Sequence, residues 1–201
     1  MTRIAFACLI ALGATIGPAA AQDEQMISTY SSLDFDKACS QTPDTDDEDG
    51  IGAELWCDGW QGIAVRVVEG DLRFALGYGR NAPDQCSSQQ TLGPFHTIGK
   101  TLEWRVMREF PGHLTPVATI LRYKTEADGK TGEYLVVTRL DRTQACHMAY
   151  VDVRTQKNAN ALARLAADRY GPAFDCARDR AFMMTAAGPA AGETPGTGGC
   201  E

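Results

Sequence analysis

Cysteines are the residues with the most definite chemistry in this 201-residue chain, which contains seven of them. Cys8 lies in an apolar N-terminal run, and the other six come later: Cys39, Cys57, Cys86, Cys146, Cys176 and Cys200. An even number of cysteines in an exported chain indicates disulfides, because the compartments outside the cytoplasmic membrane are oxidising. No Cys-x-x-Cys or Cys-x-x-His spacing occurs, so we expect no metal site and no cofactor.

The positions of these cysteines favour particular pairs. Cys39 and Cys57 flank a polar, acidic segment, and a bond between them would close that segment as a loop. Cys146 lies in an expected strand and Cys176 follows an expected helix, so this pair would hold the helix against the sheet. The remaining two cysteines either bond to each other or stay free. Closing loops of these sizes stabilises a fold by roughly 3–4 kcal/mol each.

Aromatic and histidine side chains are the candidate binding residues. Trp56 and Trp60 flank a turn next to Cys57, where they either shield a disulfide or present a flat surface to a sugar or protein partner. Trp104 lies in an alternating apolar strand, so core packing is its expected role. His96 lies in an expected loop and completes the candidate binding set with Trp56 and Trp60.

Catalysis by histidine is the alternative use of these residues. The sequence has neither a His-Glu-x-x-His zinc motif nor a Gly-x-Ser-x-Gly elbow. A triad can still form from residues that are distant in sequence, since chain order does not define it. The alternative function is therefore a small periplasmic hydrolase that uses the loop histidines His96 and His113, and no catalytic residue is assigned.

The N-terminus predicts export. A short positive start, an apolar run over 4–16 and Ala19-Ala20-Ala21 are typical of a cleavable signal peptide over 1–21. No later segment approaches the roughly 20 apolar residues of a membrane-spanning helix. We expect a periplasmic or secreted protein with no membrane span after cleavage.

Residues 22–180 predict a single α+β domain, a mostly antiparallel β-meander of about six strands packed by one C-terminal helix and stapled by disulfides. Strands are expected over 63–68, 72–78, 102–106, 117–123, 134–140 and 145–153. Gly70 should supply the positive φ of the first hairpin turn, and Asp128-Gly129 that of the second.

One helix is expected from Asn158 or Asn160 to Gly171-Pro172, with Leu162 and Leu165 facing the sheet. The chain then becomes rich in Ala, Gly, Pro and Thr, which predicts a disordered tail over 181–201.

The charge balance restricts the partners. The chain has 26 Asp and Glu against 19 Lys and Arg, a net charge of −7. Without a basic cluster it is not expected to bind nucleic acid. A negative field favours encounter with a cationic protein, and a cell-envelope component is the other partner considered.

The stretches WCDGWQGIAVRVVEGDLRFALGYG, PVATILRYKT and YLVVTRL, with the region from Cys146 to Cys176, resemble an exported alphaproteobacterial family of unknown function over residues 30–177. In that pattern the recurrent cysteines are Cys39, Cys57, Cys146 and Cys176, whereas Cys86 and Cys200 are additions. The general build is also loosely similar to periplasmic lysozyme inhibitors, an analogy of architecture only. The function expected from the sequence is non-catalytic binding of a protein or envelope component, inhibitor-like in kind.

Overall fold

A computed structural model describes residues 25–41 and 52–200 of the chain. The expected signal peptide and all but the first residue of the acidic segment 41–50 lie outside the described residues. The strands are β1 Met26–Ser32, β2 Cys39–Gln41, β3 Glu54–Cys57, β4 Val65–Gly70, β5 Arg73–Tyr78, β6 Thr91–Leu92, β7 Phe95–Ile98, β8 Thr101–Glu109, β9 His113–Ala127, β10 Lys130–Leu140, β11 Ala145–Asp152, β12 Phe182–Thr185, β13 Gly188–Ala190 and β14 Gly196–Thr197. The helices are α1 Phe35–Ala38 and α2 Ala159–Tyr170, with 3-10 turns η4 Trp60–Gly62, η5 Gly79–Asp84, η6 Cys86–Ser88 and η7 Gly171–Ala173.

The strands form two main sheets, where the sequence predicted one meander of about six strands. An eight-stranded sheet has the order β1-β8-β9-β10-β11-β12-β13, and β7 pairs with β9 beyond the end of β8. The order β2-β3-β4-β5 makes a separate four-stranded sheet, and β6 pairs with β14. The expected antiparallel meander is present from β8 to β11. Alternating apolar residues predict strands, but they do not say which strands share a sheet.

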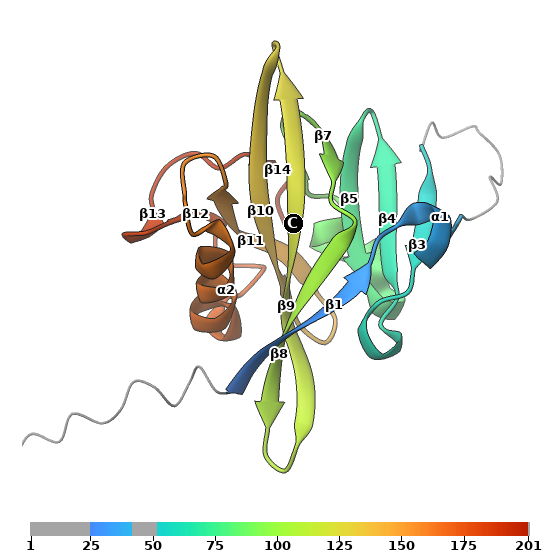
Figure 1. Cartoon of the computed structure of the whole chain (residues 1–201). Helices are drawn as coiled ribbons and strands as arrows, with labels where there is room; N and C mark the ends of the chain where they lie inside the picture. The colour runs from blue at the N-terminus through green and yellow to red at the C-terminus, as the bar shows by residue number, and fades with distance from the viewer. Residues whose placement is uncertain (1–24, 42–51, 201) are drawn as a thin grey trace, which may run out of the picture.

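The two sheets and α2 stack as three layers (Figure 1). One face of the eight-stranded sheet packs against the four-stranded sheet, around a core that includes Val67, Trp104 and Tyr123. The opposite face packs against α2 around Val137 and Met148. Trp104 is fully buried and its Nε1 donates to Ser31 Oγ at 2.9 Å, so its expected core role is confirmed.

The helix lies where the sequence placed it, but it faces the sheet with alanines. Leu162 is half-buried and packs against the core between α2 and the sheet, whereas Leu165 is 44% exposed, so the expectation that Leu165 buries against the sheet is wrong. The buried positions are Ala159, Ala163, Ala166 and Ala167. These positions recur at three- and four-residue spacing, and small side chains let the helix lie close to the sheet.

The two predicted hairpins form, with one difference at the turn. In the β9–β10 turn, Asp128 and Gly129 both have positive φ, as expected from Asp-Gly. In the β4–β5 turn, Gly70 is the last strand residue and the positive φ angles belong to Asp71 and Leu72. The prediction that Gly70 supplies this conformation is therefore corrected.

Three disulfides join the elements, and two of them are the pairs that the sequence indicated. Cys39–Cys57 links β2 to β3, and Cys146–Cys176 ties β11 to the segment after α2. The sequence left open whether Cys86 and Cys200 bond to each other or stay free, and the structure contains a Cys86–Cys200 bond. Among the described residues, no helix is both long and apolar enough to cross a membrane.

The C-terminal segment differs from the disordered tail expected over 181–201. After α2 crosses over, β12 pairs in parallel with β11, and β13 pairs with β12. β14 then pairs with β6, and Cys200 is bonded to Cys86. The composition of this segment predicted disorder because few of its side chains can be buried. Strand pairing through the backbone and a disulfide hold the segment in place instead.

Candidate functional site

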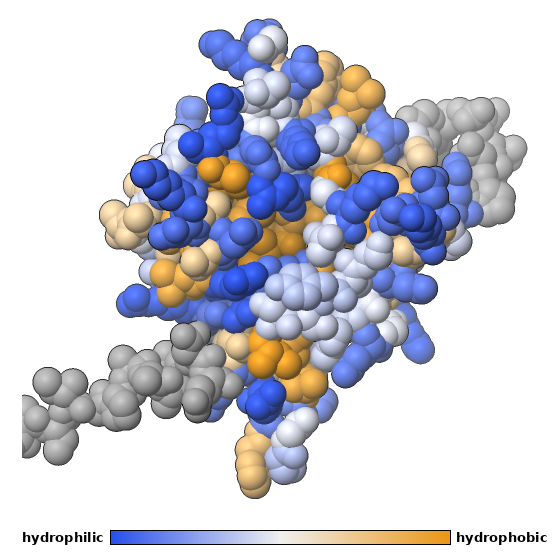
Figure 2. All heavy atoms as spheres, in the orientation of Figure 1, coloured by the Kyte–Doolittle hydropathy of each residue, from blue (hydrophilic) through white to orange (hydrophobic). Residues whose placement is uncertain are grey.

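An apolar groove of about 1000 Å³ lies at the end of the molecule where the β4–β5 turn, β7 and the β9–β10 hairpin come together. In Figure 2, apolar side chains show between the tips of the two hairpins, with polar side chains around them. The apolar residues that line the groove are Phe35, Ala53, Leu55, Leu72, Phe74 and Phe95. Lys124, Glu126 and Arg154 are among its charged lining residues. This size and lining are typical of a preformed binding site.

Two apolar side chains at this groove are strongly exposed. Leu72 is 62% exposed and Phe95 is 45% exposed. The Arg73 guanidinium lies over the Phe95 ring, 4.9 Å from its centroid, which holds that ring by a cation–π contact. Deeper in the groove, Phe35 and Phe74 stack with centroids 6.1 Å apart. The groove therefore presents ordered aromatic walls that can receive an apolar side chain.

Leu72 occupies a conformation that disfavours leucine. Its φ is 59°, in the left-handed region where a Cβ crowds the following carbonyl. That crowding costs about 1–2 kcal/mol, and glycine or asparagine normally fills such a turn position. The Leu72 carbonyl accepts a hydrogen bond from the His96 backbone N–H at 2.9 Å, which ties the turn to β7. An exposed apolar side chain is thus held in place at an energetic cost.

His96 closes the back of the groove and is engaged by backbone groups through both ring nitrogens. Nδ1 donates to the Pro94 carbonyl at 3.0 Å, so the proton lies on Nδ1. Nε2 accepts from the Phe74 N–H at 2.8 Å, and the ring is 4% exposed. The imidazole therefore joins β7 to β5. His96 lies at this groove in strand β7, not in the expected loop, and acts there as a positioning residue, while its expected role in binding stays a prediction.

The structure does not bring Trp56 or Trp60 to this groove. Trp56 is half-buried on the outer face of the four-stranded sheet, where its Nε1 donates to Glu54 Oε1 at 2.9 Å. The Arg66 guanidinium beside Glu54 lowers the pKa of that carboxyl, and the Trp56 hydrogen bond lowers it further. Trp60 packs against the core between the sheets. Neither indole lines the apolar groove or any of three other cavities in the described part of the chain.

The other histidines lie far from His96 or inside the core. His113 begins β9, whereas His96 pairs with Thr125 near the end of β9, roughly 40 Å along the strand. His147 is 3% exposed, and its Nδ1 lies 3.0 Å from the Tyr150 hydroxyl. Burial lowers the pKa of His147 to about 3. These positions do not assemble the loop histidines into one constellation.

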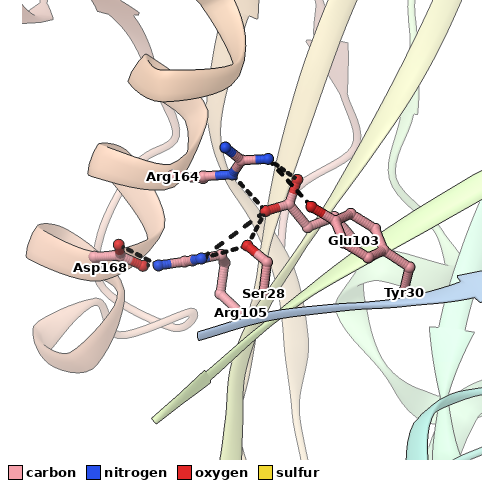
Figure 3. A network of polar contacts seen from close by, with 6 residues as sticks. All are labelled: Ser28, Tyr30, Glu103, Arg105, Arg164 and Asp168. Carbon is pink, nitrogen blue, oxygen red and sulfur yellow. Dashed lines mark hydrogen bonds and ion pairs between the residues drawn. The ribbon is translucent and has the colours of Figure 1, made fainter. Parts of the chain in front are cut away.

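Apart from the apolar groove, a cluster of charged and polar side chains joins α2 to the eight-stranded sheet (Figure 3). Arg105 on β8 donates to Asp168 on α2, through Nε at 2.8 Å and Nη2 at 2.6 Å. Arg164, one turn earlier on α2, donates to both oxygens of Glu103, at 2.6 and 3.1 Å. We call these four residues, with Ser28 and Tyr30 of β1, the helix–sheet network.

The spacing in the sequence explains this geometry. Glu103 and Arg105 are two residues apart on one strand, so they share a face. Arg164 and Asp168 are four apart on a helix and share its flank. Ser28 Oγ bridges the two strand residues, accepting from Arg105 and donating to Glu103. Because every charge has a partner of opposite sign, the network leaves no group free to bind or react.

The groove residues Phe35, Leu72, Phe74 and Phe95 were not singled out from the sequence. The one available signal was Leu72, an apolar residue directly after the Gly-Asp of a hairpin turn. The others come from three separate elements, and only packing brings them together. Within residues 25–41 and 52–200, no group of three or more His, Cys, Asp or Glu side chains is placed to hold a metal ion.

Comparison of the whole chain with protein-family models, with curated proteins and with solved structures found no match.

Proposed function

We propose that this chain is an exported, non-catalytic binding module whose apolar groove receives an apolar side chain of a cationic partner protein. The observation that carries the proposal is Leu72, an exposed apolar side chain kept at the groove in a left-handed conformation. The hairpin turn requires this backbone conformation but not a leucine, and a residue held in an unfavourable conformation is a candidate for a functional role.

The surroundings of the groove support a partner protein of this kind. The net charge of −7 attracts cationic proteins and raises their encounter rate. Aromatic side chains in a preformed pocket are the usual anchors of protein interfaces. Three disulfides and the expected signal peptide agree with a periplasmic or secreted location.

Binding is favoured over hydrolysis because of the histidine geometry. Both nitrogens of His96 contact backbone groups, and His113 lies at the other end of β9. A general base needs a ring nitrogen within reach of the proton that it removes.

The test uses a synthetic peptide with two phenylalanines flanked by lysines, titrated into the mature protein by calorimetry. One comparison peptide has glutamates in place of the lysines, and another has alanines in place of the phenylalanines. Leu72→Asn and Phe95→Ser should each weaken binding of the lysine peptide by about 5–30-fold, because each removes buried apolar contact.

Phe110→Ser is the matched control. Phe110 is 99% exposed on the turn between β8 and β9, at the opposite end of the molecule. This variant should bind the lysine peptide like the parent protein. Equal affinity for the lysine and glutamate peptides, or unchanged affinity in Leu72→Asn and Phe95→Ser, would overturn the proposal.

A further inference from the structure

A second cavity, of about 740 Å³, lies near the opposite end of β9, between η5, the start of β9 and the turn after β10. Its apolar wall includes Ile63, Val117 and Leu140. Three arginines and one aspartate also line it: Arg80, Arg139, Arg142 and Asp141. The charge of these lining side chains is positive, opposite in sign to the net charge of −7 of the chain. We call this cavity the arginine pocket.

Arg139 is the most constrained of these arginines. Its guanidinium donates from Nη1 to the Val117 carbonyl at 3.1 Å. Its Nε is buried and has no hydrogen-bond partner among the described residues. Burial lowers the pKa of Arg139, and the nearby Asp141 carboxylate offsets this only in part. That carboxylate accepts from the Thr143 N–H at 3.3 Å and makes no ion pair with the guanidinium.

Comparison with the other arginines of the described chain shows that Arg139 lacks a carboxylate partner. Counting Arg139, six arginines are buried or half-buried. Five of the six pair with a carboxylate: Arg66 with Glu54, Arg73 with Asp71, Arg105 with Asp168, Arg122 with Glu133, and Arg164 with Glu103. Arg139 is the sixth and has no such partner within the described residues. A guanidinium remains charged at any physiological pH, so burial without a counter-ion is unfavourable.

We propose that the arginine pocket binds a small organic carboxylate with an apolar body. The carboxylate meets the two Nη groups of the Arg139 guanidinium, because Nε is buried and Nη1 gives only one of its two N–H groups to the Val117 carbonyl. The apolar body lies against the wall that includes Ile63 and Leu140, and Arg80 and Arg142 add positive charge around it. This site is separate from the apolar groove and does not depend on the function proposed for that groove.

The test is calorimetric titration of the mature protein with octanoate, and in parallel with octanol and with inorganic phosphate. Octanoate should bind with a dissociation constant of about 1 mM or below, and the other two probes at least about 10-fold more weakly. Arg139→Met should weaken octanoate binding by about 10–100-fold, since it removes charge-assisted hydrogen bonds. Arg139→Lys keeps the charge but lacks the fork, and should lie between the two.

Controls separate this effect from loss of fold. Arg142→Gln, at the pocket, should weaken octanoate binding by about 2–5-fold, whereas Arg108→Gln, an exposed arginine of β8 outside the pocket, should leave it unchanged. Circular dichroism of each variant verifies the fold. Failure of octanoate to saturate, equal binding of octanol, preference for phosphate, or unchanged affinity in Arg139→Met would each overturn the proposal. None of these outcomes bears on the apolar groove.

Discussion

The helix–sheet network and the arginine pocket use the same guanidinium group in opposite ways. In the network, Arg105 has 6% of its side chain exposed and meets Asp168 through two nitrogens. In the pocket, Arg139 donates to one carbonyl, and its buried Nε has no partner among residues 25–41 and 52–200. A paired guanidinium joins elements of the fold, whereas an unpaired one beside a cavity is arranged for an anion from outside.

His147 extends this comparison to a group that can lose its charge. It is buried next to the Tyr150 hydroxyl, no carboxylate of the described part of the chain contacts it, and burial lowers its pKa to about 3. The imidazole avoids the free-energy cost of a buried charge by staying neutral. A guanidinium stays charged when it is buried, so the presence or absence of its carboxylate partner tells more about function than that of a histidine.

The largest effect is expected where a paired charge loses its partner. Arg105→Met leaves Asp168 without its bidentate donor and should destabilise the protein by about 4 kcal/mol in urea unfolding. Adding Asp168→Leu should recover much of this loss, because the uncompensated carboxylate is then gone. A loss below about 1 kcal/mol in the single variant would show that the network is not structural.

The pH dependence should be the next largest effect. The folded pKa of His147 lies below its unfolded value of 6.5, so the unfolded state binds more protons between those two values. Stability is therefore fully present above pH 6.5 and declines as the pH falls toward 3, by about 3 kcal/mol between pH 7 and pH 4. Urea unfolding at several pH values measures this. His147→Gln should show a shallower decline, and an identical slope would contradict the assignment.

Arg139→Met is the direct counterpart of Arg105→Met and should have the opposite sign. Removing a half-buried cation without a carboxylate partner should leave the stability of the ligand-free protein unchanged or raise it by about 1 kcal/mol. The same urea unfolding compares the two variants. A loss above about 2 kcal/mol would show that Arg139 serves the fold through Val117.

The smallest expected effect concerns the strained turn. Leu72→Asn should stabilise the protein by about 1 kcal/mol, because asparagine tolerates the left-handed conformation. Leu72→Ala serves as the control that gains nothing, because alanine lacks the polar group with which asparagine hydrogen-bonds the local backbone at this φ. If Leu72→Asn lowers the unfolding midpoint instead, the leucine stabilises the turn and the strain argument fails.

Local signals in the sequence predicted several features well. The Asp128-Gly129 turn and the pairing of Cys146 with Cys176 follow from short-range rules for turns and cysteine spacing. The helix ends at Tyr170, directly before Gly171-Pro172 as expected, but Gly171 has a right-handed conformation with φ −54° and not the left-handed one of a glycine cap. The same rules misplaced the positive φ of the first hairpin, because a two-residue loop can begin one position later. They also missed the order after residue 181, which depends on pairing with β11 and β6.

The sequence by itself determined a β-rich chain with a C-terminal helix, and it indicated two of its three disulfide pairs, because periodicity, turn residues and cysteine positions act over short distances. Only the tertiary structure decided the division into two sheets, the groove around Leu72 and Phe95, and the isolation of Arg139. Whether an arginine has a carboxylate partner depends on residues that can be more than 60 positions away, as Arg105 and Asp168 are. Such distances are invisible to local patterns and are set by how the layers pack.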